Sequence, residues 1–206
     1  MKTFIVIVLL LVAAIFAAEF AAGVVHWFED AYIREDSPIL GQMIGKPNVI
    51  HHHFPRYFTQ FTWWHSSRDL IIAAGLVVLA AWALGVLSWP VWVFAIVSAN
   101  ANEIHKWTHR TRKENGRVIS FFQDIGILQT ARHHALHHTD PKNSHYCTIT
   151  NYMNPVLDGV HFWERTEWLL AKTVGLKRRA DTSLHGSEKP AWIEEYRARR
   201  AKVAVN

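Results

Sequence analysis

The sequence of 206 residues contains one cysteine, Cys147. A single cysteine cannot form a disulfide within the chain, and it cannot supply the thiolates of a zinc finger or an iron–sulfur site. Charged residues are also scarce, at 19%, whereas half of the residues are apolar. This balance is low in charge for a soluble domain and is typical of a chain that partly contacts lipid.

Several other patterns are absent. Strand signals are weak and no internal repeat occurs, so we predict an all-α fold. No basic stripe interleaved with aromatic residues is found, which argues against nucleic acid as a partner. The net charge of +5 instead suits an anionic membrane surface. No His-Glu-x-x-His motif occurs, so a zinc protease would lack its general base.

Long apolar runs predict membrane spans. Residues 3–25 would form a helix of roughly 30 Å, the thickness of a hydrocarbon core. We favour a retained span over a cleaved signal peptide, because the run exceeds the usual core of about 7–15 residues and lacks an Ala-x-Ala site. Residues 70–87 form a second apolar run, and a turn at Ser88-Trp89-Pro90 leads into a third helix at 90–109.

The remaining segments are expected on one side of the membrane. Prolines and the run His51-His52-His53 make long helices unexpected in 29–69. Helices are expected at 121–136 and 156–170, at the interface or under the bundle, and at 190–203 on the surface. Since the hairpin returns the chain to the side that it left, 29–69 shares a face with everything after residue 105. All Lys and Arg except Lys2 lie on that face, which the positive-inside rule makes cytoplasmic.

We therefore predict an integral-membrane, multi-pass helical bundle with about three spans and a cytoplasmic, histidine-rich helical cap. Its parts would be a first span at 1–28, a histidine-containing segment at 29–69, a membrane hairpin at 70–109, a catalytic cap at 110–180 and a charged tail at 181–206.

Fourteen histidines carry the strongest functional signal. In the run from His133 to His138, the four histidines would lie at about 0°, 100°, 40° and 140° around a helix, all on one side. His105 and His109 are spaced i,i+4 and share a helix face. The run at 51–53 forms a third group, in which we interpret His51 as a neighbour of two functional residues.

Neutral imidazole binds iron, zinc and copper. Eight or so convergent histidines can hold two metal ions, whereas a structural zinc needs four ligands. An oxygen-activating site with two iron ions is therefore the best fit.

The first span carries a polar stripe. Glu19, His26 and Asp30 are spaced i, i+7 and i+11, so they line one side of the helix. A carboxylate inside a span costs about 2.5–3.5 kcal/mol on insertion scales, so Glu19 should face the bundle interior. Glu19 could belong to a stripe that runs into the metal site, or it could pair with a polar neighbour such as Asn100.

These motifs resemble the plasmanylethanolamine desaturase (Kua/CarF) family. The resemblance covers roughly residues 24–180. It rests on Asn102-Glu103-Ile104-His105-Lys106-Trp107-Thr108-His109, Phe122-Gln123-Asp124, Arg132 to Pro141, His145-Tyr146-Cys147-Thr148-Ile149-Thr150 with Asn154, and the early His26-Trp27 with Asp30.

The resemblance implies an O2-dependent di-iron oxidoreductase that desaturates a lipid chain near its glycerol end, most readily by converting a plasmanyl to a plasmenyl (vinyl ether) lipid. Its partners would be the phospholipid, O2, the membrane and a separate electron donor of cytochrome b5-like or ferredoxin-like type. The implied metal ligands are His26, His52, His53, His105, His109, His133, His134, His137, His138 and His145, with Asp30 and Asp124 as catalytic carboxylates.

Three alternatives stay open. Animal members of the family have a histidine near the position of Gly126, which this chain lacks, so an acyl-lipid substrate competes with an ether lipid. A hydroxylase could use the same two irons. A metal-binding membrane protein without catalytic activity is the alternative from another class.

Overall fold

The computed structural model describes residues 1–179 and 191–203, so parts of the predicted tail at 180–190 and 204–206 lie outside the described residues. All regular structure in the described residues is helical, which confirms the all-α prediction. The helices are α1 (Lys2–Tyr32), α2 (Lys46–His53), α3 (Trp63–Ala83), α4 (Trp89–Ala99), α5 (Ala101–His109), α6 (Arg112–Asp124), α7 (Ala131–His137), α8 (Met153–Gly159), α9 (Phe162–Thr173) and α10 (Ala191–Val203).

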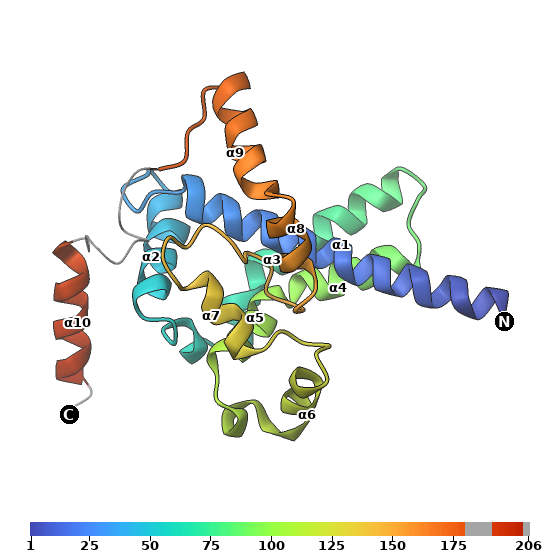
Figure 1. Ribbon diagram of the computed structural model, residues 1–206, viewed down its shortest axis with the longest axis horizontal. Coiled ribbons are helices and arrows are strands. Elements are labelled where there is room, and N and C mark those ends of the chain that lie inside the picture. Colours follow the sequence, from blue (N-terminus) through green and yellow to red (C-terminus); the bar gives the residue numbers. More distant parts are fainter. Residues whose placement is uncertain (180–190, 204–206) are drawn as a thin grey trace.

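Two helices, α1 and α3, are long and apolar enough to cross a membrane by length and composition. The N-terminal end of α1 extends beyond every other element (Figure 1). Helix α4 is also apolar, but its 11 residues reach only about 16 Å, which is less than a hydrocarbon core of roughly 30 Å. The count of three spans therefore stays a prediction.

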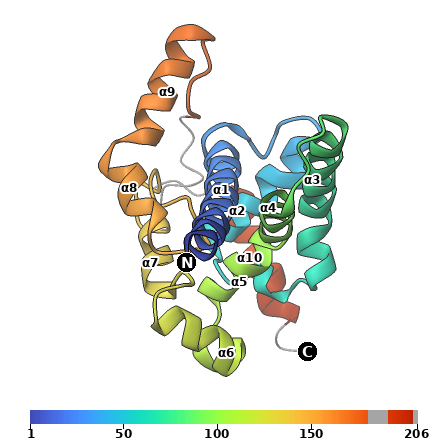
Figure 2. The same cartoon turned by 90° about the vertical axis from the view of Figure 1, so that its right-hand side faces the viewer.

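Helix α4 packs along α1 and against α3, and Figure 2 shows the three helices side by side. Ala14 and Ala18 of α1 and Ala95 of α4 are buried. Small side chains of this kind allow helix backbones to approach closely. Because α4 packs along α1, the C-terminal end of α1 and the segment that follows α4 lie at the same end of the molecule.

The prediction of one continuous helix at 90–109 was wrong, because Asn100 separates α4 from α5. Its backbone has φ −103° and ψ 4°, outside the helical range. Its side chain donates to the Ile96 carbonyl at 2.8 Å and accepts from Trp63 Nε1 at 2.8 Å. An asparagine side chain that bonds to nearby backbone competes with helix continuation in this way.

Two further helices expected from the sequence are each divided in two. The helix expected at 121–136 ends at Asp124, because Gly126 adopts φ 79° and Thr130 begins α7 by accepting a hydrogen bond from the His133 N–H. The helix expected at 156–170 is interrupted at His161, which has φ 54° and separates α8 from α9.

Between the end of α1 and the start of α3, residues 33–62 of the predicted segment 29–69 contain only short helices, as the prolines predicted, whereas residues 63–69 belong to the long helix α3. A π-helical turn at Gly41–Gly45 leads into α2, and a 3₁₀ turn at Phe58–Gln60 follows. The helix expected at 190–203 corresponds to α10, whose Ile193 packs against Val49 and Ile50 around α2. Helices α2, α5 and α7 meet near the C-terminal end of α1, and the histidines lie there.

Candidate metal centre

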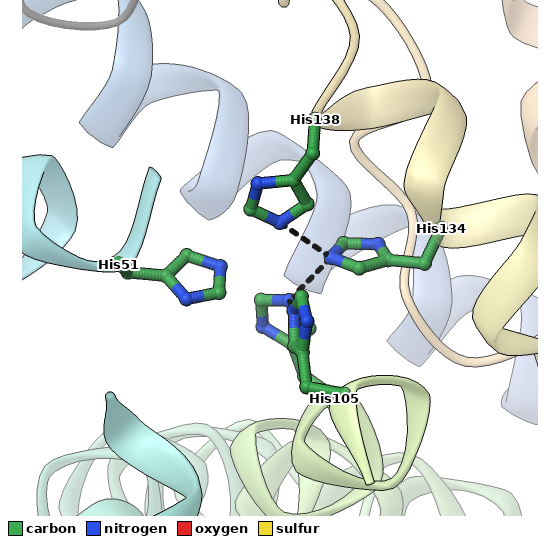
Figure 3. A group of neighbouring side chains, drawn as sticks. His51, His105, His134 and His138 are labelled. Carbon is green, nitrogen blue, oxygen red and sulfur yellow. Dashed lines mark hydrogen bonds between the residues drawn. The ribbon is translucent and has the colours of Figure 1, made fainter. Parts of the chain in front are cut away.

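Five histidines from three helices converge on one point. Helix α2 contributes His51, α5 contributes His105 and His109, and α7 contributes His134 with His138 at its C-cap. One ring nitrogen of each lies within 4.8 Å of the others. The i,i+4 spacing on α5 and at the end of α7 directs each pair to one side. Figure 3 shows the rings of His51, His105, His134 and His138 facing a common point. We call these residues the five-histidine group.

The nitrogens of this group face one another at close range. The Nε2 atoms of His105 and His134 are 2.8 Å apart. His109 Nε2 is 3.2 Å from His105 Nε2, and His138 Nε2 is 3.2 Å from His134 Nε2. A ring nitrogen carries at most one hydrogen, so His105 and His134 cannot satisfy both of their nitrogen neighbours by donating. A metal cation would accept all of these lone pairs at once.

His51 supports this interpretation independently. Its side chain is buried, and neither of its ring nitrogens has a hydrogen-bond partner among the described residues. A buried polar atom without a partner costs free energy unless another group, such as an ion, satisfies it.

A second group lies beside the first and consists of His26 and Asp30 of α1, His52 of α2 and His137 of α7. We call it the Asp30 group. All four residues are buried, and their ligand atoms also lie within 4.8 Å of one another. Asp30 Oδ2 is 3.4 Å from His137 Nε2 and 4.0 Å from His26 Nε2, while Asp30 Oδ1 is 3.1 Å from His52 Nε2.

Backbone carbonyls fix the tautomers of two histidines in the Asp30 group. His26 Nδ1 donates to the Tyr146 carbonyl at 3.0 Å, and His137 Nδ1 donates to the Ser144 carbonyl at 2.9 Å. In the neutral rings, Nε2 then carries a lone pair. Both Nε2 atoms are buried and have no hydrogen-bond partner among the residues that the structure describes. A ligand histidine that donates its other N–H to a carbonyl is the usual arrangement at metal sites.

Electrostatics keeps the imidazoles in the form that binds metal. Burial, reinforced by neighbouring histidines, holds the pKa values of His51, His105 and His134 well below their usual range. Burial likewise lowers the pKa of His109 to about 3. These rings are therefore neutral at physiological pH, as metal ligands must be.

The two groups are close enough to form one binuclear centre. The ring centroids of His26 and His105 are 5.3 Å apart, and those of His52 and His138 are 5.1 Å apart. The donor set is eight imidazoles and one carboxylate, without a thiolate. Such a nitrogen-rich set fits iron or zinc rather than calcium or magnesium, which prefer oxygen.

Three histidines predicted as ligands lie outside both groups. His53 is the last residue of α2 and belongs to neither group. His133 Nε2 accepts from Asn154 Nδ2 at 3.3 Å, and the ring centroids of His133 and His145 are 5.4 Å apart. His145 Nδ1 lies 3.1 Å from Asp158. For these three histidines, a ligand role stays a sequence prediction.

The two predicted catalytic carboxylates have different surroundings. Asp30 lies inside the Asp30 group, where Asn48 donates to Oδ1 at 2.7 Å. Asp124 is exposed and pairs with Arg112 on α6, away from both groups. A catalytic role for Asp124 stays a prediction. Glu19 pairs with neither metal group nor Asn100, and its carboxyl oxygens accept from Thr150.

Comparisons with known proteins show the family of the chain. A family model described as a lipid desaturase domain matches residues 15–181. A probable fatty acid desaturase of Acanthamoeba polyphaga mimivirus is 32% identical over 79% of this chain and 82% of the relative.

Two further relatives are named as plasmanylethanolamine desaturases. Plasmanylethanolamine desaturase of Myxococcus xanthus is 30% identical over 80% of this chain and 60% of its own length. Plasmanylethanolamine desaturase 1 of Mus musculus is 30% identical over 85% of this chain and 69% of its own length. No solved structure matches the chain. The chain therefore belongs to the lipid desaturase family.

Proposed function

We propose that this protein is an O2-dependent di-iron oxidoreductase that introduces a C=C bond into a phospholipid chain near the glycerol. The preferred reaction converts a plasmanyl to a plasmenyl lipid. The observation that carries the proposal is the pair of adjacent imidazole groups, one of which consists entirely of buried residues and includes Asp30. The family of the chain and the names of its relatives supply the desaturase chemistry.

In the proposal, each group holds one iron ion. The five-histidine group would supply nitrogen ligands alone, and the Asp30 group would supply three nitrogens and a carboxylate. Bound iron would provide, with O2 and two electrons, the oxidising power to remove hydrogen from unactivated C–H bonds, which protein side chains lack. The protein would hold the ligands, exclude water and present two neighbouring carbons of the lipid.

An apolar groove supports reaction near the headgroup. A hollow of about 400 Å³ lies between α1, α3 and α4, with Ala13, Ala17, Ala81 and Phe94 in its lining. Ala17 precedes His26 by nine residues, which is about 14 Å along α1. A lipid tail in this groove would have its distal carbons away from the metals and its headgroup end near them.

The electron donor would be a separate protein of cytochrome b5-like or ferredoxin-like type. A basic hollow of about 340 Å³ on α6 includes Lys113 and Arg117 and offers a docking surface for an acidic donor. In this proposal the histidine-rich face is cytoplasmic, because nearly all Lys and Arg lie on that side of the predicted spans.

The test expresses the chain in a host that makes saturated ether phospholipids but lacks this activity. Acid treatment of the extracted lipids should release a long-chain aldehyde, because a vinyl ether is acid-labile and an alkyl ether is not. A matched strain that expresses Asp30→Ala should release none.

The product distinguishes the alternatives. A new double bond in an acyl chain without aldehyde would support an acyl-lipid desaturase and overturn the plasmenyl product. A hydroxylated lipid would favour a hydroxylase on the same metals. Unchanged lipids, from a chain that binds iron and receives electrons, would favour a non-catalytic metal-binding protein.

A further inference from the structure

One side of α1 packs against an irregular segment that follows α7. We call this segment, residues 144–150, the strap. Thr150 donates from its backbone N–H to Glu19 Oε1 and from its hydroxyl to Glu19 Oε2, both at 2.8 Å. Seven residues further along α1, His26 donates to the Tyr146 carbonyl. Glu19 and Tyr146 are completely buried, so these bonds are shielded from water.

Between these two contacts, α1 and the strap approach very closely. A Cβ atom added to Gly23 would lie 2.6 Å from Cys147 Sγ, and 3.5 Å from the Cα and N atoms of Cys147. The first distance is a severe overlap, whereas the second is ordinary contact. The close approach thus requires glycine at position 23 and limits the size of the side chain at position 147. This packing accounts for the buried cysteine without a reactive role.

The strap is itself held rigidly by the cap. Asn154 accepts from the Cys147 N–H at 2.9 Å and donates to the Cys147 carbonyl at 2.8 Å. Gln129 donates to the carbonyls of Cys147 and Thr150 and bonds through its backbone N–H to Ile149. Asn154 and Gln129 are both buried. Because the Ser144 carbonyl also holds His137, the strap connects the ligands of α1 with those of α7.

The other directional contacts of α1 lie beyond His26, where Trp27 Nε1 donates to Glu167 at 2.9 Å and the Arg179 N–H donates to the Ala31 carbonyl at 2.8 Å. The packing of α1 with α4 includes small apolar residues such as Ala18, and contacts of this kind permit sliding and rotation. A slip of one residue moves a helical side chain by about 1.5 Å along the axis and about 100° around it. Such a slip would remove both His26 and Asp30 from the Asp30 group.

We infer that the strap sets the axial position and rotation of α1 and thereby builds the Asp30 group. Glu19, Gly23, Cys147 and Thr150 are positioning residues that act through His26 and Asp30. This inference rests on the proposed function, because it assumes that the two groups bind metal. It assigns a role to Glu19, which the metal centre itself does not use.

The experiment measures metal binding rather than turnover. The purified full-length protein is loaded with ferrous iron without oxygen and equilibrated against graded chelator, and the iron that remains per chain is counted. Gly23→Ala should release the iron of the Asp30 group at about 10–100-fold lower chelator concentration, as changes around metal ligands do, while the other iron stays bound. Glu19→Leu should behave likewise, and His26→Ala gives the reference pattern for loss at this group.

A second-site change separates positioning from general damage. Cys147→Ala removes the sulfur that a Cβ at position 23 would strike, so Gly23→Ala with Cys147→Ala should recover most of the lost affinity. Gly75→Ala on α3 is the matched control, because no atom lies within 4 Å of its added Cβ, and it should change nothing.

Three results would overturn the inference: unchanged affinity in Gly23→Ala, equal weakening of both irons, or no recovery in the double variant. Absence of tight iron binding by the unaltered protein would instead overturn the proposed function. Two bound irons whose release is unchanged in Gly23→Ala and Glu19→Leu but altered in His26→Ala would leave the proposed function intact and reject the role of the strap.

Discussion

The two candidate metal-binding groups share helices α2 and α7, but the Asp30 group is completed by α1 and the five-histidine group by α5, and the two are held in different ways. In the Asp30 group, backbone carbonyls fix His26 and His137, and Asn48 fixes Asp30. In the five-histidine group, Nδ1 of His134 and of His138 is buried without a hydrogen-bond partner in the described part of the chain. The Asp30 group is therefore oriented by hydrogen bonds, whereas the five-histidine group depends on helix packing and on the metal.

The groups also differ in charge. Five neutral imidazoles would not neutralise any of the positive charge of a bound metal ion, whereas the carboxylate of Asp30 would neutralise part of it. An anionic ligand favours the more oxidised state of an iron ion relative to neutral ligands. Two irons bound here should therefore be inequivalent, which distinguishes this centre from one with identical halves.

Removing Asp30 should have the largest effect. Asp30→Ala deletes the only carboxylate in either group, so metal affinity at that group and turnover should each fall by at least about 100-fold, more than loss of a supporting residue costs. Glu29→Ala is the matched control, since it removes the adjacent carboxylate of α1, which belongs to neither group. Equal losses in the two variants would contradict the assignment. Iron content and lipid product are measured together.

Comparing His51 with His53 tests the five-histidine group. His51→Ala should lower iron affinity at this group and reduce turnover by about 10-fold or more, because one of five ligands is lost. His53→Ala should retain both irons. The reverse result would restore the sequence interpretation, in which His52 and His53 are the ligands and His51 is their neighbour.

The smallest effect is expected at Asp124. Asp124→Asn breaks an ion pair with Arg112 that is exposed to solvent, and exposed ion pairs contribute little to stability. Thermal stability, iron content and turnover should stay close to those of the unaltered protein. Loss of turnover with both irons still bound would establish the catalytic role that the sequence resemblance implies.

The histidine positions show how far sequence reasoning extends. Helical spacing predicted that His105 and His109 act together, and the structure places both in one group. The same reasoning placed the four histidines at 133–138 on one side of a helix. However, α7 ends at His137, and the structure divides these histidines between the two groups and leaves His133 outside.

Other features depend on contacts that no local pattern encodes. Three consecutive histidines at 51–53 lie about 100° apart on a helix, so the sequence alone cannot tell which two face the centre. The partner of Glu19, Thr150, is 131 residues away in an irregular segment. Asn100 and His161 interrupt helices through local hydrogen bonding and backbone conformation, which apolar periodicity does not reveal.

The most direct test of the metal centre is Mössbauer spectroscopy of the protein loaded with ⁵⁷Fe. We expect two iron ions per chain and two quadrupole doublets of equal area, one for each group. In Asp30→Ala the doublet of the Asp30 group should disappear while the other persists. One iron per chain, a single doublet for both irons, or stoichiometric zinc in protein made with ample iron would contradict the account.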